Sequence, residues 1–79
     1  MEKTRECALQ WVNDGKPCIY RYGFAWKGAC HRSITTEKAK ELIAKPCWSF
    51  GMGFYELCWE RHDNEQVLCF NEYSENDLL

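Results

Sequence analysis

The sequence lacks a long hydrophobic run, since no stretch of about 18 apolar residues occurs in it. A helix that crosses a membrane needs about 20 such residues, so we expect no membrane association. The opening stretch MEKTRECALQWVNDGK has no apolar core of a signal peptide. We therefore expect a cytoplasmic protein.

Closely spaced cysteine pairs are also missing. Ten to sixteen residues separate neighbours in the set Cys7, Cys18, Cys30, Cys47, Cys58 and Cys69, and no CxxC or CxH motif occurs. Cytoplasmic thiols stay reduced, so we interpret most of the six as small buried apolar side chains. The alternatives are a Cys58–Cys69 disulfide in an oxidising compartment and a metal site that adds Cys30 to this pair. We expect no metal and no cofactor.

Catalytic motifs are absent from the sequence, which contains no phosphate-binding glycine loop, HExxH or GxSxG. Cys30 and His31 are adjacent in a predicted strand, so their side chains point to opposite faces. Glu56 and Glu60 share a face but lie about 13 Å apart by strand rise, too far for a carboxylate pair. We expect a protein that is not an enzyme.

The chain has 79 residues, which predicts a single domain over 1–79. Its aromatic content is high, with four Trp, four Tyr and four Phe to fill a small core. Residues 1–49 carry nine basic and five acidic side chains, a balance of +4, whereas residues 50–79 carry one basic and seven acidic, a balance of −6. Attraction between the two halves is one interpretation, and a basic binding face is the other.

Two helices are predicted from apolar spacing. The first covers 3–13, with Ala8, Trp11 and Val12 on one face and Gly15 after its end. The second is capped by Thr35 and ends at Lys45-Pro46. We expect 47–53 to be a loop or an irregular start of the next strand.

Two hairpins are predicted from alternation of side chains. In the first, over 18–34, a Lys27-Gly28 turn sets Tyr22 opposite Ser33 and Arg21 opposite Ile34. In the second, strands 54–61 and 66–73 flank a turn over His62-Asp63-Asn64-Glu65. A two-residue or a four-residue loop centred there gives the same register, with Cys58 opposite Cys69.

Short similarities between the two halves, including the Lys-Pro-Cys triplets at 16–18 and 45–47, indicate an internal repeat over 3–34 and 35–73. The predicted fold is α+β with tandem αββ units (αββαββ). Its four-stranded antiparallel sheet is made of two hairpins, and both helices pack on one face. We expect the tail 74–79 to be frayed.

Tyr20, Tyr22, Phe24 and Trp26 alternate along the first hairpin, and we expect them to form the core face. The opposite face then carries many apolar side chains, namely Ala25, Cys30, Ile34, Cys58, Val67 and Cys69. On so small a protein we expect an apolar face of this kind to be covered by another protein or by a second copy of the chain. We therefore predict a non-catalytic interaction domain that binds another protein or forms a homodimer. The predicted binding residues are Arg21, Ala25, Lys27, Cys30, Arg32 and Ile34.

The alternative is binding of single-stranded nucleic acid. Aromatic side chains that stack on bases, interleaved with cations that contact phosphates, are typical of such proteins. The residues of this alternative are Tyr20, Tyr22 and Trp26 with Arg21, Lys27 and Arg32.

Overall fold

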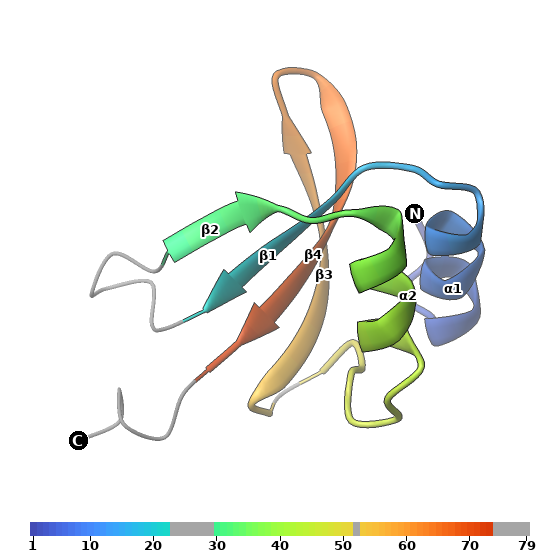
Figure 1. Ribbon diagram of the computed structural model, residues 1–79, viewed down its shortest axis with the longest axis vertical. Helices are drawn as coiled ribbons and strands as arrows, with labels where there is room; N and C mark the ends of the chain where they lie inside the picture. Colours follow the sequence, from blue (N-terminus) through green and yellow to red (C-terminus); the bar gives the residue numbers. More distant parts are fainter. Residues whose placement is uncertain (23–29, 52, 74–79) are drawn as a thin grey trace.

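The computed structural model describes residues 1–22, 30–51 and 53–73, which form two helices and one mixed sheet (Figure 1). The elements are α1 (Arg5–Asn13), β1 (Cys18–Tyr22), β2 (Cys30–Ser33), α2 (Thr36–Ile43), β3 (Tyr55–His62) and β4 (Glu65–Glu72). The predicted small α+β class is therefore confirmed. Both described helices are too short and too polar to cross a membrane.

Threonine side chains begin both helices. The hydroxyl oxygen of Thr4 accepts from the amide of Cys7 at 3.2 Å, and that of Thr35 accepts from the amide of Lys38 at 3.1 Å. Each satisfies an amide that the first turn leaves without an intrahelical partner. Gly15, at φ 71°, turns the chain out of α1. The predicted cap at Thr35 and helix-ending glycine are both confirmed.

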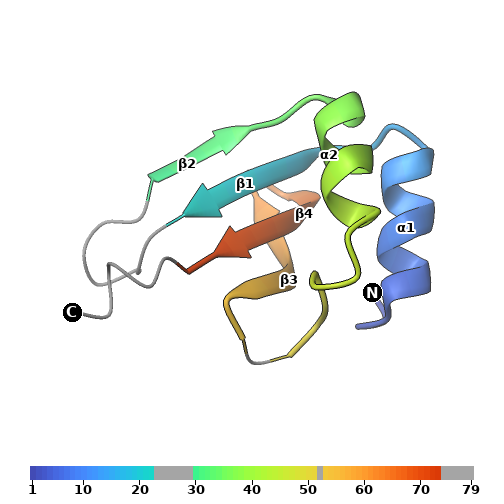
Figure 2. The same ribbon diagram turned by 60° about the horizontal axis from the view of Figure 1, so that its bottom comes forward.

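The two helices pack against one face of the sheet, as Figure 2 shows. The core between them is centred on Phe70 of β4 and on Trp48, which are 0% and 1% exposed. Their rings meet edge to face with centroids 5.3 Å apart. Around them lie the other buried members of this core, Ala8, Trp11, Val12, Cys18, Ala39, Leu42, Ile43, Leu57 and Leu68.

The strand order is β2-β1-β4-β3, and β1 runs parallel to β4. The prediction of a wholly antiparallel sheet is therefore wrong. Residues 67–71 of β4 are all buried. A strand that is buried on both faces is typical of the centre of a sheet, so β4 lies between two other strands. With β4 beside β1, its hairpin partner β3 takes the outer position.

The first hairpin has a different register from the predicted one. Tyr22 pairs with Cys30 rather than with Ser33, a shift of three positions. A shift by an odd number of positions moves the side chains of β2 to the opposite face of the sheet. The amide of Ile34 accordingly bonds to the carbonyl of Cys18, and Ile34 packs against the core on the helix side. The rest of the predicted ladder and turn lies outside the described residues, namely Phe24, Trp26, Lys27 and Gly28.

The second hairpin has the predicted register, with Cys58 opposite Cys69. Asp63 and Asn64 form its two-residue turn at φ 53° and 65°. Both residues tolerate this left-handed region better than most, which explains the tight turn.

The internal repeat is not supported. Cys18 begins β1 directly after its Lys-Pro pair, whereas Cys47 lies in a turn and β3 begins only at Tyr55. The segment between them contributes the buried Trp48 and a short parallel bridge from Ser49 to Glu56. The predicted tail, 74–79, lies outside the described residues.

Candidate functional site

Polar and sulfur-containing side chains gather on the sheet face opposite the helices. Alternation along β3 places Cys58, Glu60 and His62 on this face. Arg21 of β1 and Cys69 of β4 join them. We call these five residues the Glu60 cluster.

Glu60 is the centre of the cluster. Arg21 donates to both carboxylate oxygens, from Nη1 to Oε2 at 2.9 Å and from Nη2 to Oε1 at 2.8 Å. Nε2 of His62 lies 2.8 Å from Oε1. The hydrogen bonds from Arg21 hold the pKa of Glu60 at about 2, well below its usual value.

Two thiols lie beside this carboxylate. Sγ of Cys58 is 3.9 Å from Oε2 of Glu60, and the donor atoms of Glu60, His62 and Cys69 all lie within 4.8 Å of one another. Burial raises the pKa of both thiols, Cys69 more than Cys58. Cys69 is also 0% exposed, so a substrate cannot reach its sulfur. The thiol of Cys69 is therefore close to an imidazole and a carboxylate without being an accessible nucleophile.

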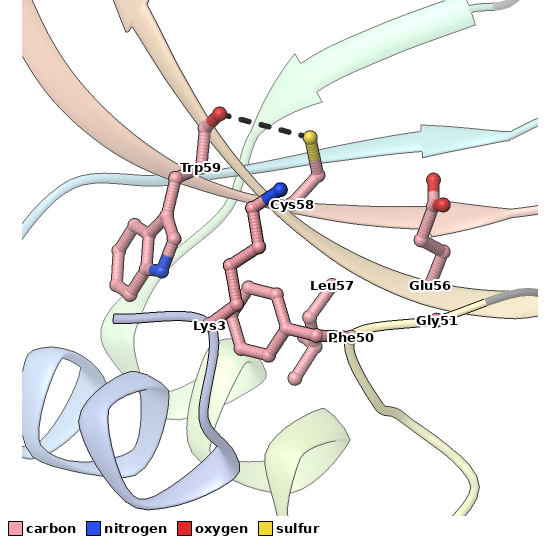
Figure 3. A pocket seen from close by; sticks show the side chains of 7 residues that line it. All are labelled: Lys3, Phe50, Gly51, Glu56, Leu57, Cys58 and Trp59. Atoms are coloured by element: carbon pink, nitrogen blue, oxygen red, sulfur yellow. Dashed lines mark hydrogen bonds between the residues drawn. The ribbon is translucent and has the colours of Figure 1, made fainter. Parts of the chain in front are cut away.

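A pocket of about 420 Å³ opens at the outer edge of β3 (Figure 3). It is lined by Lys3, Phe50, Gly51, Glu56, Leu57, Cys58 and Trp59. Cys58 belongs to both the pocket and the Glu60 cluster, and the ammonium group of Lys3 lies near enough to lower its pKa slightly against the larger effect of burial. The pocket therefore connects solvent to one edge of the cluster.

A second group of side chains lies on the helix face of the sheet, where β1 and β4 run on past the helices (Figures 1 and 2). Tyr22, Glu72 and Tyr55 are consecutive cross-strand partners. Tyr20 stacks on Tyr22 with ring centroids 5.8 Å apart, and its hydroxyl donates to Oε1 of Glu72 at 3.0 Å. We call these four residues the tyrosine row.

The tyrosine row is partly open to solvent. Tyr22 is 38% and Tyr55 40% exposed, whereas Tyr20 is half-buried. Burial and the hydrogen bond to Glu72 raise the pKa of Tyr20 to about 12. Tyr22 and Tyr55 thus each expose part of their side chains to solvent, beside the half-buried carboxylate of Glu72.

Two of the predicted binding residues, Arg21 and Ile34, lie on opposite faces of the sheet. Arg21 lies in the Glu60 cluster, whereas Ile34 packs against the helix-side core on the other face. Ala25 and Lys27 lie outside the described residues, and only the backbone of Cys30 and Arg32 is described, in β2.

The sheet face opposite the helices is also less apolar at its surface than predicted from the sequence. Ile19, Val67 and Cys69 form a small cluster there and are 9%, 6% and 0% exposed. Arg21 and Glu60 extend across this face, so the described part of it leaves little apolar area for a partner to cover.

Glu60 and His62 were not predicted to be neighbours, because His62 was expected in the turn of the second hairpin. In the structure His62 is the last residue of β3. The pattern Cys58-x-Glu60-x-His62 was the available signal, since period-two spacing brings all three to one face. Tyr55 and Glu72 were missed because the parallel pairing of β1 and β4 was not foreseen.

Comparisons with known proteins assign no family to this chain. No protein-family model matches it, and searches of curated proteins and of solved structures give no match.

Proposed function

We propose that this chain is a small non-catalytic domain that binds another protein, and that the tyrosine row is its contact surface. The observation that carries the proposal is the row itself, in which Tyr22 and Tyr55 flank Glu72 in register across three strands. Tyrosine is enriched at the energetic centres of protein interfaces because it buries a large, rigid ring and keeps a polar end.

The chemistry of the row favours a basic side chain in the partner. A lysine or arginine that reaches Glu72 would form an ion pair beside the partly exposed side chains of Tyr22 and Tyr55. The ring of Tyr20, which stacks on Tyr22 and whose hydroxyl bonds to Glu72, borders this site. The expected ligand is therefore a protein segment with an exposed lysine or arginine.

The contact surface thus differs from the face expected from the sequence. Arg21 of that face is paired with Glu60, and Ile34 lies in the core. The nucleic-acid alternative loses support for a related reason, because Arg21 lies on the face opposite Tyr20 and a carboxylate occupies the middle of the row. Phosphates are repelled by such a carboxylate.

A titration of the ¹⁵N-labelled chain with a lysine-rich peptide tests the proposal. Backbone amide shifts should concentrate at Tyr22, Tyr55 and Glu72, and a glutamate-rich peptide of equal length should cause none. Y22A and E72Q should each weaken binding about tenfold, as expected when a central interface residue is removed.

Leu9 provides the matched control, because it is 38% exposed, as Tyr22 is, and lies on α1. L9A should bind the peptide as the wild type does. Equal weakening by L9A and Y22A, or shifts spread over the whole chain, would contradict the proposal.

Two further measurements separate the other partners. Salt-sensitive tryptophan quenching by a single-stranded oligonucleotide that Y22A abolishes would replace the protein ligand with nucleic acid. Light scattering of the unliganded chain tests the predicted homodimer, and a monomer at high concentration would exclude a second copy as the partner.

A further inference from the structure

We propose that the Glu60 cluster is a zinc site in which Cys58, Glu60, His62 and Cys69 are the four ligands. This inference concerns the face opposite the tyrosine row and does not depend on the proposed function. It also departs from the sequence-based expectation that the chain takes no metal.

The four residues combine the ligand types that zinc prefers. Two thiolates, an imidazole and a carboxylate form a mixed set of sulfur, nitrogen and oxygen donors, whereas calcium and magnesium take oxygen ligands alone. Three of the four come from alternate positions of one strand, and the fourth, Cys69, is the cross-strand partner of Cys58. The hairpin therefore holds all four on one face.

Three of the four ligand atoms already lie near one another. Zinc binds sulfur at about 2.3 Å and nitrogen or oxygen at about 2.0–2.2 Å, which sets donors around one ion roughly 3.3–3.8 Å apart. Here the donor atoms of Glu60, His62 and Cys69 are within 4.8 Å of one another, and Sγ of Cys58 is 3.9 Å from Oε2 of Glu60. Closing this set on one ion requires the Cys58 thiol to turn away from the carbonyl of Trp59, which it contacts at 3.7 Å.

Arg21 supplies the charge that the ligand set needs. Two thiolates and one carboxylate around Zn²⁺ leave a net charge of −1, which the guanidinium group neutralises. Arg21 bonds to both oxygens of Glu60, so it can keep Oε2 while Oε1 turns to the metal. Such outer partners orient the ligands of many metal sites.

The surroundings of the cluster indicate a structural site rather than a catalytic one. Four protein ligands leave no open position for a substrate or an activated water. Ile19 and Val67 pack around Cys69 and shield its sulfur from water. The His62 side chain, 41% exposed, and the pocket beside Cys58 give the ion a route from solvent.

Cobalt titration of the full-length reduced chain tests the proposal, with Co²⁺ as a spectroscopic substitute for Zn²⁺. We expect visible bands of a tetrahedral site and a near-ultraviolet sulfur-to-cobalt band, saturating at one ion per chain. Zn²⁺ should then displace the colour stoichiometrically. Zn²⁺ alone should raise Tm, because it binds the four ligands of the folded hairpin, whereas the unfolded chain holds no preformed site.

Variants of two accessible ligands assign the site. C58S should lose about half of the sulfur-to-cobalt intensity, and C58S and H62Q should each weaken Co²⁺ binding about tenfold or more. Both positions are partly exposed, so these chains should still fold, unlike variants of the buried Cys69. C47S is the matched control, since Cys47 is an exposed free cysteine outside the cluster.

The proposal is overturned by a weak octahedral cobalt spectrum, or by no binding at one equivalent. It is also overturned if C47S reduces the sulfur-to-cobalt band as much as C58S does. Unchanged affinity in H62Q would remove the imidazole from the site and with it the proposed ligand set.

Discussion

Glu60 connects two strands that are not neighbours, because Arg21 reaches it from β1 across β4. The two side chains are 25% and 27% exposed, so water screens the pair only in part. An ion pair of this kind contributes more than a fully exposed one and costs less to desolvate than a fully buried one.

The depressed pKa of Glu60 makes stability depend on pH in a defined window. A carboxylate whose pKa is lower in the folded chain stabilises it above the unfolded value, 4.5, and that contribution is lost as pH falls towards about 2. E60Q should therefore lower the free energy of unfolding by about 1–2 kcal/mol at neutral pH. Urea denaturation should show this difference shrinking between pH 4.5 and 2.

E41Q is the control for this prediction. Glu41 pairs with Lys38 at 3.6 Å, but their side chains are 61% and 52% exposed, so its removal should cost less than about 0.5 kcal/mol. The interpretation fails if E60Q and E41Q have equal effects, or if the effect of E60Q does not change with pH.

At the scale of elements, the β3–β4 hairpin depends on its turn. Asn64 has φ 65°, where a β-branched side chain meets the backbone. N64V should therefore lower the free energy of unfolding by about 1–2 kcal/mol. E65V, one residue further on at an exposed strand position, should change it little, since valine suits a strand. Thermal denaturation compares the two, and equal Tm values would contradict the assignment of strain to the turn.

The same hairpin shows what could be predicted from sequence. Alternation on both sides of Asp63-Asn64 fixed its register because the turn is local and only a few residues tolerate it. In the first hairpin, Lys27-Gly28 was only one of several possible turn positions, and the observed register differs by three. The parallel β1–β4 pair could not be foreseen, since no local pattern encodes which distant strands meet.

Trp48 and the two candidate sites show the same limit. The stretch 47–53 has neither helical nor strand periodicity, so the sequence could not predict which of its aromatic side chains are buried. In the structure Trp48 is among the most buried side chains. The Cys58–Cys69 pairing was predictable because it lies within one hairpin. The tyrosine row was not, because its members come from three strands whose order depends on tertiary packing.

At the scale of the whole molecule, the centre of the sheet should be its most stable part. Leu68 is 0% exposed, and its amide donates to the carbonyl of Pro17 at 3.2 Å. Its exchange with solvent deuterium should require global unfolding. The amide of Ser33 points away from β1 on the edge strand β2, so it should exchange without global unfolding. Native-state exchange by NMR measures both, and comparable protection at the two sites would contradict this order.

The parallel ladder between β1 and β4 has a consequence for synthesis on the ribosome. It pairs Cys18 with Leu68, fifty positions later in the chain, so a nascent chain that has already made β1 must wait for β4. Until then one edge of β1 has no partner strand, and its apolar side chains have no Leu68 or Phe70 to contact. Long-range pairing of this kind is slow and leaves an open strand edge on which aggregation can begin. The time needed to synthesise the chain from β1 to the end of β4 therefore sets how long this strand edge stays open.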